Sequence, residues 1–361
     1  MATVMPAGTS GLAISLGAIV TLSMFPFVPQ LVGRYGAKNL AVLFALFESS
    51  ILFALSINPN PLLAIILVAL ACATSPLIAY QLDLLLEATV VNEQETGRIR
   101  TKFLTAANIA LVVAPLGIGL ILGNTDNYSR VFLFASVTLI PFILLILVTK
   151  FPQNTVPSLS NVRDACICIY NDRDLRAIAF CNMTLQFFFH LAPLYVPLYL
   201  HSVLGLPWST LGWMFAVMLI PFVLLEYPAG YLADTKYGDK LFMLIGFVLM
   251  GSAFAFTGFV TSATPLLWIL FVLVLSRIGA AFVEAMTEGH FFRRVSEKDT
   301  NTVTIFRMMR PGGALLAPII GSLLLSVVSY QAFFISTGLI IVFAGIVSAR
   351  ALRATSNEAC S

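Results

Sequence analysis

Three charged side chains fall inside one long apolar segment, residues 265–289, where they could bind an ion or carry a proton. Arg277 lies about twelve residues into the segment, Glu284 follows seven positions later, and Glu288 four positions after that. In a helix these spacings place all three on one side. A charge in the middle of a membrane costs about 3 kcal/mol or more, so each needs a partner or a function. We expect Arg277 to bind an anion or carboxylate and Glu284 to carry a coupling proton; the alternative is an internal ion pair that holds the helices together.

A polar stripe follows one side of a second apolar segment, residues 177–202. Asn182, Gln186 and His190 are spaced four residues apart, about one helical turn, so they share a face that we expect to point inward. Because histidine titrates near neutral pH, His190 could serve a proton-coupled cycle; a histidine that only satisfies interior hydrogen bonds is the alternative. Asn108, in another apolar segment, could hydrogen-bond to a solute in a cavity or equally to a neighbouring helix.

Further charged residues lie where apolar segments begin or end. We expect them to form charge clusters between helix ends, with structural or gating roles and not solute contact: Glu226, Asp83, Glu87, Glu288, Arg307 and Arg310. Glu48 differs, because it lies about ten residues into an apolar segment. It could be protonated, or it could hydrogen-bond to Ser49, Ser50 or a neighbouring helix.

The composition indicates a membrane protein. The chain has 361 residues, of which 59% are apolar and 10% charged, whereas soluble proteins carry about 25% charged residues. So few charges cannot cover a water-exposed surface. A helix needs about 20 apolar residues to cross the hydrocarbon core, and helices satisfy their own backbone hydrogen bonds in lipid. The sequence therefore predicts an all-α membrane protein with about eleven spans, near residues 11–33, 39–57, 62–86, 103–122, 130–149, 177–202, 208–232, 241–261, 265–289, 306–327 and 330–350.

The basic residues predict how these spans are oriented. The connections between successive spans must alternate between the two sides of the membrane. Of the 20 Lys and Arg residues, Arg277 falls inside a span and Arg130 falls on one side. The other 18 fall on the opposite side. Cytoplasmic connections carry an excess of Lys and Arg. We therefore expect the C-terminus in the cytoplasm, an external N-terminus, and insertion in the plasma (inner) membrane.

The chain contains an internal repeat with an offset of about 202 residues. Three pairs of features keep this offset: Tyr35-Gly36-Ala37-Lys38 with Tyr237-Gly238-Asp239-Lys240, Asp83 and Glu87 with Glu284 and Glu288, and Ala114-Pro115 with Ala317-Pro318. We predict two pseudo-symmetric helix bundles, residues 1–150 and 177–361, joined by a cytoplasmic linker at 151–176. The offset places the counterpart of the span at 177–202 before residue 1, so we expect five spans in the first half and six in the second.

A charged turn in the second half carries a family signature. Gly230-Tyr231-Leu232-Ala233-Asp234, followed by Lys236, Gly238 and Lys240, resembles the cytoplasmic signature of the major facilitator superfamily, one residue longer than usual. The first-half copy has Gly33 where the family has Asp. The resemblance implies two parallel repeats around a central cavity that opens alternately to the two sides. It also implies a conformational lock at Asp234 and its signature neighbours, and a cavity lined by the spans that contain Gln186, His190 and Arg277.

These patterns predict a secondary active transporter of the major facilitator type that lacks the family's first transmembrane helix. Its expected partners are a small solute, a proton or sodium ion for coupling, and membrane lipid, with no nucleic acid; it is expected to be a monomer. No Gly-x-x-x-x-Gly-Lys loop is present, so ATP does not drive it directly, and no motif suggests an enzyme, a cofactor or a metal site. The alternative is a transporter-fold sensor or scaffold that does not transport.

Overall fold

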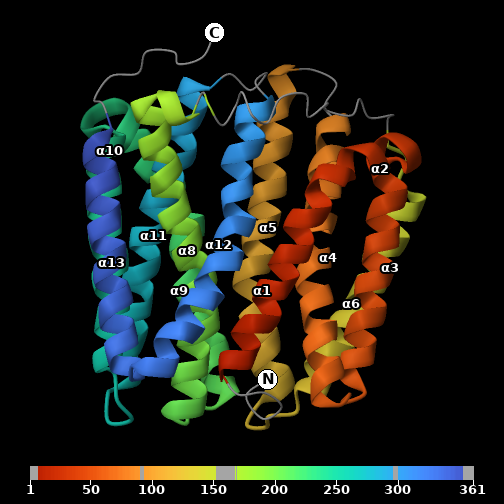
Figure 1. Ribbon diagram of the computed structural model, residues 1–361, viewed down its shortest axis with the longest axis horizontal. Helices are drawn as coiled ribbons and strands as arrows, with labels where there is room; N and C mark the ends of the chain where they lie inside the picture. Colours follow the sequence, from red (N-terminus) through yellow and green to blue (C-terminus); the bar gives the residue numbers. More distant parts are fainter. Residues whose placement is uncertain (1–6, 90–92, 152–166, 168, 296–299, 353–361) are drawn as a thin grey trace.

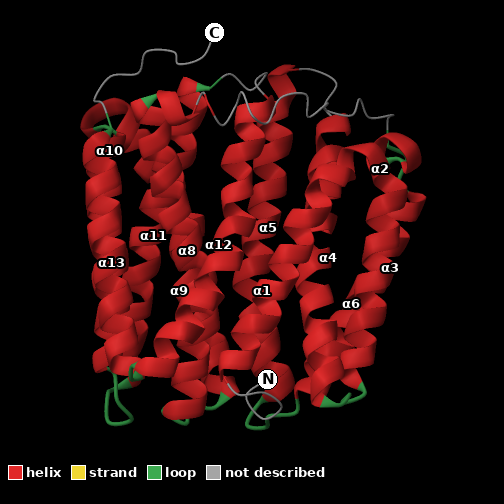
Figure 2. Cartoon of the chain, in the orientation of Figure 1, coloured by secondary structure: helices red, strands yellow, loops and turns green. Residues whose placement is uncertain are grey.

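In the computed structural model, every regular element of the described residues is a helix (Figures 1 and 2). The structure describes residues 7–89, 93–151, 167, 169–295 and 300–352. The long helices run roughly parallel to one another, so their connections gather at the two ends of the bundle. Helices that cross a bilayer adopt this arrangement because each satisfies its own backbone hydrogen bonds.

The first half consists of helices that match the expected spans. They are α1 (Ala7–Met24), α2 (Val28–Tyr35), α3 (Ala37–Ser56), α4 (Pro61–Thr89), α5 (Glu93–Leu122) and α6 (Tyr128–Val148). Only a short 3-10 turn, Phe25–Phe27, separates α1 from α2, so the two helices together form one span.

The second half contains six long helices. They are α8 (Arg173–Leu198), α9 (Trp208–Leu232), α10 (Asp239–Phe256), α11 (Leu266–Arg294), α12 (Thr300–Val327) and α13 (Tyr330–Ala351). Short π-helical turns extend α8 over Tyr199–Val203 and α9 over Ala233–Tyr237. Within the described residues, nine helices are long and apolar enough to cross a membrane, and Ala13–Met24 and Ile109–Leu122 are two shorter apolar stretches. Together they agree with the predicted number of about eleven spans.

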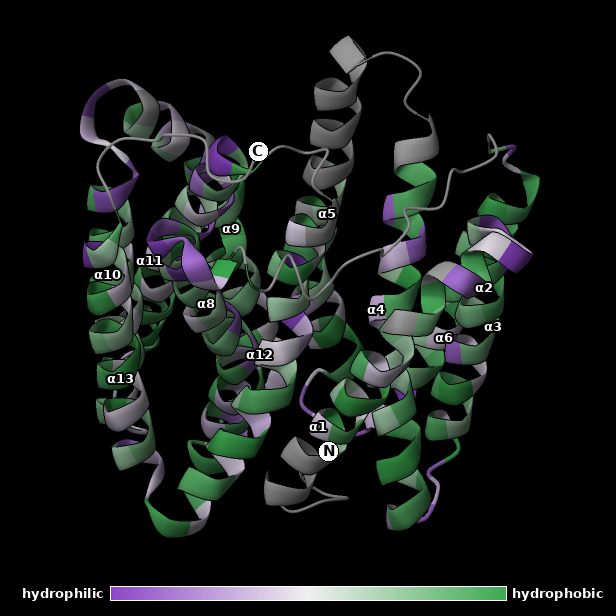
Figure 3. Ribbon diagram, turned by 45° about the horizontal axis from the view of Figure 1, so that its top comes forward, coloured by the Kyte–Doolittle hydropathy of each residue, from purple (hydrophilic) through white to green (hydrophobic). Residues whose placement is uncertain are grey.

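The two ends of the bundle differ in charge. One end, here called the basic end, holds the α2–α3 and α9–α10 junctions and the end of α11. Its described Lys and Arg residues include Arg34, Lys38, Lys150, Arg173, Arg176, Lys236, Lys240, Arg293, Arg294 and Arg350. Hydrophilic residues gather there, whereas the middles of the helices are hydrophobic (Figure 3). The other end, here called the far end, holds the α5–α6 and α8–α9 connections, with Arg130 near the start of α6.

The repeated Tyr-Gly-x-Lys sequence forms the same structure in both halves. Gly36 ends α2 with a φ of 79°, and Gly238 ends the π-helical turn after α9 with a φ of 73°. Glycine adopts this left-handed backbone without steric cost, so the chain can turn sharply there. Two residues later, Lys38 Nζ donates to the carbonyl oxygens of Leu147 (2.8 Å) and Thr149 (2.7 Å) at the end of α6. Lys240 Nζ makes the equivalent bonds at the end of α13, to Arg350 (2.9 Å) and Leu352 (3.0 Å).

Helix packing follows the same repeat. Helix α10 packs against α11 and α13 as α3 packs against α4 and α6. Helix α9 packs against α11 in its own half and α5 in the other, as α1 packs against α4 and α12. Helix α8 packs against α11, α12 and α13, and no described helix of the first half takes the corresponding position. The two bundles are therefore pseudo-symmetric except at α8.

The largest group of buried apolar side chains lies within the second half and holds α8 in place. The ring centroid of Phe254 on α10 lies 5.6 Å from that of Phe188 on α8. Tyr195, also on α8, lies 5.0 Å from Phe333 of α13 and donates a hydrogen bond to the carbonyl of Pro318 on α12 (3.0 Å). Close packing and interhelical hydrogen bonds of this kind stabilise helix bundles in lipid.

Candidate functional site

Arg277 lies on α11 in the interior of the second half. Its side chain is 4% exposed, and Cζ lies 5.0 Å from the centre of the Phe188 ring. The Nε atom is buried without a hydrogen-bond partner, and within the described residues no carboxylate forms an ion pair with the guanidinium. A cation over an aromatic face gains about 0.5–2 kcal/mol, less than burial of an uncompensated charge costs. The arrangement leaves Arg277 able to bind an anion.

The polar stripe of α8 lies against α12. Asn182 Nδ2 donates to the carbonyl of Phe306 (3.3 Å), and Gln186 Nε2 donates to Asn182 Oδ1 (3.3 Å). The helices can approach because residue 313 is glycine: a Cβ on Gly313 would lie 2.7 Å from the carbonyl carbon of Gln186. Gln186 Oε1 is buried and has no hydrogen-bond partner in the part of the chain that the structure describes. The stripe therefore faces the interior and retains an acceptor that a ligand could use.

His190 is the least buried member of the stripe. Its Nδ1 lies 2.8 Å from the carbonyl oxygen of Gln186, so Nδ1 bears a hydrogen that it donates. The side chain is partly exposed, and Arg310 of α12 lies within electrostatic reach of it.

The carboxyl groups of α9 and α11 form a cluster with Arg310. Glu284 of α11 interacts electrostatically with Glu226 of α9, with Arg310 of α12, and with Glu288 one turn along α11. The structure thus brings together residues from four helices, α8, α9, α11 and α12. In such a cluster the charge on each group alters the protonation of the others. Their roles in transport remain predictions.

Two expected gating residues meet across the halves. Arg307 Nη1 of α12 lies 3.2 Å from Asp83 Oδ2 of α4, at the basic end, with 42% and 45% of the side chains exposed. A pair this exposed contributes about 0–1 kcal/mol, which suits a contact that is broken and remade. Of Glu87 and Asn108 the structure describes the backbone only, so these predictions lie outside the described side chains.

A model of the Major Facilitator Superfamily matches residues 177–359, just over half of the chain. This chain belongs to that superfamily. The predicted family and the all-helical membrane fold are therefore confirmed, and the general function is membrane transport. The sensor or scaffold alternative finds no support.

Solved transporters of this superfamily share the whole fold. The chain is 18% identical to the nucleoside transporter NupG, with a TM-score of 0.73, over 96% of this chain and 90% of that one. It is 11% identical to a bacterial homolog of the human lysosomal transporter Spinster in an inward-facing, unoccupied conformation, with a TM-score of 0.75 and the same coverage. A probable sulfoacetate transporter, SauU of Cupriavidus necator, is 29% identical over 117 residues. That match covers 32% of this chain and 27% of the relative, so the chain aligns with about a quarter of that protein.

The signature turn of this superfamily member lies at the basic end. Gly230 is in the last turns of α9, and Lys236 Nζ lies 4.9 Å from the ring centre of Tyr237. Gly238 and Lys240 make the turn and the helix cap described above. The side chain of Asp234 is outside the described part, so its role in a conformational lock stays a prediction.

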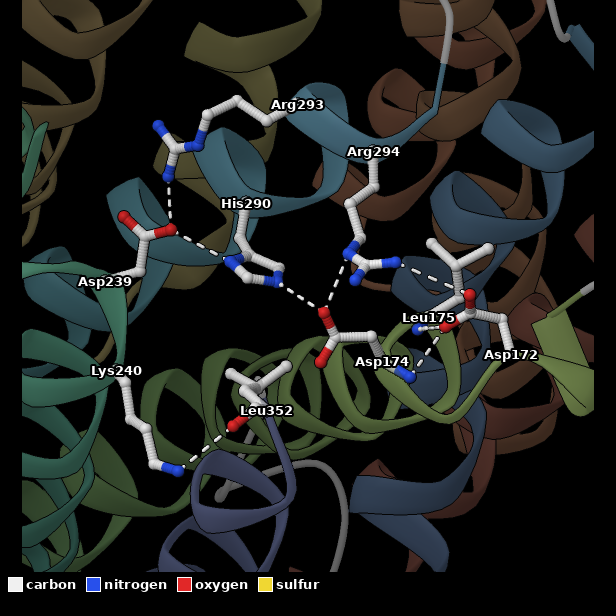
Figure 4. Close-up of polar contacts among 9 residues, drawn as sticks. All are labelled: Asp172, Asp174, Leu175, Asp239, Lys240, His290, Arg293, Arg294 and Leu352. Carbon is white, nitrogen blue, oxygen red and sulfur yellow. Dashed lines mark hydrogen bonds and ion pairs between the residues drawn. The ribbon is translucent and has the colours of Figure 1, made fainter. Parts of the chain in front are cut away.

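An ion-pair network that the sequence did not reveal joins three helices at the basic end (Figure 4). His290 of α11 lies between two carboxylates, with Nδ1 2.9 Å from Asp239 of α10 and Nε2 3.4 Å from Asp174 of α8. Arg294 Nε lies 2.7 Å from Asp174 Oδ2, and Arg293 pairs with Asp239. One part of this region had a signal in the sequence: an aspartate, Asp172, directly before α8. It caps the helix, because its Oδ1 accepts from the backbone nitrogens of Asp174 (2.7 Å) and Leu175 (2.9 Å). The partners on α10 and α11 are too distant in sequence to be matched by spacing.

Glu48, in the middle of α3, has a partner on the neighbouring helix. Ser75 Oγ of α4 donates to Glu48 Oε1 of α3 at 2.9 Å. Of the hydrogen bonds considered from the sequence, the one to a neighbouring helix is present; protonation of Glu48 stays a prediction.

Proposed function

We propose that this transporter moves a small organic anion by alternating access, and that the anion binds to the guanidinium of Arg277. The strongest support is a side chain that is 4% exposed and has no carboxylate partner among the described residues. A buried charge left without its partner costs about 2–5 kcal/mol. An anion that pairs with Arg277 recovers this free energy on binding, which favours anionic over neutral solutes.

The name of one relative also supports an anionic solute. That protein is called a probable sulfoacetate transporter, and sulfoacetate carries a carboxylate and a sulfonate. A carboxylate accepts two parallel hydrogen bonds from the planar guanidinium of an arginine. Because the match covers only 27% of the relative, we take from it the sign of the charge and the small size of the solute.

We infer further that a proton accompanies the anion, with sodium as the alternative coupling ion. Glu284 lies within electrostatic reach of Glu226 and Arg310. A carboxyl group in such surroundings changes its protonation when the local charge changes. Binding of an anion nearby adds negative charge, so it favours proton uptake at Glu284. His190, which also feels the charge of Arg310, is the second candidate for the proton pathway.

In this proposal the basic end faces the cytoplasm and the protein lies in the plasma (inner) membrane. The excess of Lys and Arg at that end supports the orientation. Described polar contacts between the halves are concentrated at the far end, for example Ser209 to Gly123 (backbone, 2.9 Å) and Ser209 Oγ to Asn124 Oδ1 (2.9 Å). This distribution supports a conformation in which the far end is closed. Because the basic end faces the cytoplasm in this proposal, that conformation is an inward-facing state.

Uptake by purified protein in lipid vesicles tests the role of Arg277. The substrates are radiolabelled monocarboxylates, dicarboxylates and sulfonates, first ranked by thermal shift of the detergent-solubilised protein. We expect Arg277→Ala to lower uptake about 30-fold or more, because 2 kcal/mol is the lower bound for losing one member of a buried charge pair. Arg277→Lys keeps the charge but not the planar fork, and should fall between wild type and Arg277→Ala.

The matched control is Arg350→Ala, which removes an exposed arginine from the basic end. It should transport like wild type. If Arg277→Ala folds, as judged by a monodisperse elution profile, and still takes up the same anions at the wild-type rate, Arg277 does not bind the solute.

A further inference from the structure

The two halves of the molecule meet closely at the far end. A Cβ on Gly212 of α9 would lie 2.7 Å from the Cα of Gly119 of α5, so the two backbones are in direct contact. Beyond this point, the π-helical turn Tyr199–Val203 and the start of α9 lie against the α5–α6 connection, residues 123–127. Any movement that opens the far end must separate these segments.

One histidine connects the halves at this contact. His201 Nδ1 lies 2.8 Å from the carbonyl oxygen of Leu206, and Nε2 lies 2.8 Å from Asp126 Oδ1 in the α5–α6 connection. A carbonyl oxygen can only accept, so Nδ1 must bear a hydrogen. An ionised carboxylate also only accepts, so Nε2 must bear a second hydrogen unless the carboxyl of Asp126 bears it. Either way, the pair holds one proton more than a neutral imidazole beside an ionised carboxylate.

Aromatic rings shield one side of this pair. The His201 ring lies 4.6 Å from the ring of Trp208, at 36°, and Trp208 in turn contacts Tyr128 edge to face at 6.0 Å. The His201 side chain is 17% exposed and that of Asp126 47%. The contact is therefore partly shielded yet open enough to exchange protons with water.

Few other ionisable groups surround the histidine. The α5–α6 connection and α6 supply Asp126, Tyr128, and Arg130, which is exposed. Tyr128 interacts electrostatically with Asp126. Helices α8 and α9 supply Tyr199 and uncharged residues at this end, and α13 begins with Tyr330. Among the described residues at the far end, this pair is therefore the one place where an imidazole bridges the two halves, and imidazoles in general are the side chains that switch charge near neutral pH.

We propose that His201 and Asp126 form a proton-operated latch that keeps the far end closed. With the extra proton, the pair makes a charge-assisted hydrogen bond, which is about twice as strong as a neutral one. When the pH rises, the imidazole loses this proton, the attraction across the halves weakens, and the far end opens more readily. By linkage, the closed state takes up a proton that the open state releases. The latch does not depend on Arg277 or on the identity of the solute.

The test is the distance between the halves at the far end, measured by pulsed electron resonance in lipid nanodiscs. Spin labels are attached to Asn60→Cys and Ser262→Cys, which are exposed in far-end connections of the two halves, in a background without the five native cysteines. For the wild-type latch, the ratio of short to long distances should rise about 1.5- to fivefold between pH 8.5 and pH 5, the range for one partly exposed ion pair.

Three variants separate the latch from other effects of pH. His201→Gln and Asp126→Asn should each remove the dependence on pH, and His201→Arg should keep the short distance at pH 8.5 because its charge is permanent. Asn124→Ala is the matched control: it removes the acceptor of Ser209 Oγ but no titratable group, so it should change the ratio at both pH values equally. No change with pH in the wild type, or an unaltered change in both His201→Gln and Asp126→Asn, would overturn the proposal. Failure of Arg277→Ala to affect transport would leave this result unchanged.

Discussion

Lys38 in the first half and Lys240 in the second make the same contact: each donates to two carbonyl oxygens at the end of the last helix of its half. In the middle of the membrane the halves differ. An offset of 201 relates Ser276-Arg277 of α11 to Ser75-Pro76 of α4. The second half therefore has a buried cation where the first half has a proline. The two halves therefore share the framework of the bundle but differ in which of them has a buried charge at this position.

The first half also has an ionisable side chain in the middle of an apolar helix, Glu48 of α3. Glu48 accepts a hydrogen bond from Ser75, whereas the buried Nε of Arg277 has no hydrogen-bond partner among the described residues. A polar group that is satisfied within the protein has little to gain from a solute, and one that is not satisfied gains much. This contrast is the reason to assign solute binding to the second half.

The halves also differ in how much of their last helix is buried. In α13 44% of the most apolar stretch is buried, against 17% in α6. Helix α8 packs on α13, and no described helix packs in that way on α6. The second half is thus the better packed body, and its stability should respond more to single substitutions.

The largest effect should come from the network that ties α8 to α11. Asp174 is 1% exposed and pairs with Arg294, which is 4% exposed. Breaking a buried pair leaves one charge uncompensated, so Asp174→Ala should lower the free energy of unfolding by about 3–5 kcal/mol. Thermal unfolding of the protein in detergent measures this.

The control for that experiment lies at the same end of the molecule. Asp83→Ala breaks the exposed pair with Arg307 and should cost at most about 1 kcal/mol. Equal losses in the two variants would mean that the network around Asp174 does not stabilise the second half more than a surface pair would.

A gain in stability is expected from the first half. Gln81 on α4 is 0% exposed, and neither polar atom of its amide has a hydrogen-bond partner among the described residues. An offset of 201 relates Gln81 to Phe282 on α11, whose ring centroid lies 5.5 Å from that of Phe242. A buried unsatisfied polar group costs about 1–3 kcal/mol. Gln81→Leu should therefore raise the free energy of unfolding by that amount.

Leu82→Ala, a substitution at the neighbouring half-buried position, removes apolar contacts and should lower stability. It thus controls for a general response of α4. A lower unfolding temperature in Gln81→Leu would show that the amide of Gln81 has a partner after all.

Much of this fold could be predicted from the sequence, because the bilayer dictates the length of each apolar segment. The helix ends were harder. Helix α5 begins at Glu93 and not near residue 103, since a helix can continue into water where the apolar signal has ended. Helix α8 begins at Arg173 because Asp172 caps it, a signal that a capping rule would have found.

For the candidate site, the sequence identified the residue but not its contacts. Arg277 was identifiable because one cation among many apolar residues is conspicuous, but its position over Phe188 required knowledge of how α8 and α11 pack. The same holds for His290, whose two carboxylates are 51 and 116 residues away in the chain. Spacing arguments reach about two turns along one helix, and contacts between helices lie beyond them.

The smallest effect on stability should come from Lys38 and Lys240, and it should be equal in the two halves. A lysine that bonds to the last carbonyls of a helix adds about 0.3–1 kcal/mol through hydrogen bonding and the helix dipole. Lys38→Met and Lys240→Met keep the apolar stem and remove the charge, and they should lower the free energy of unfolding by similar amounts within that range. Because the two contacts are far apart, the double variant should lose the sum. If Lys240→Met lowered the free energy of unfolding several times more than Lys38→Met, the second half would depend on its lysine contact more than the first half does. The two contacts would then be alike in geometry but not in energy.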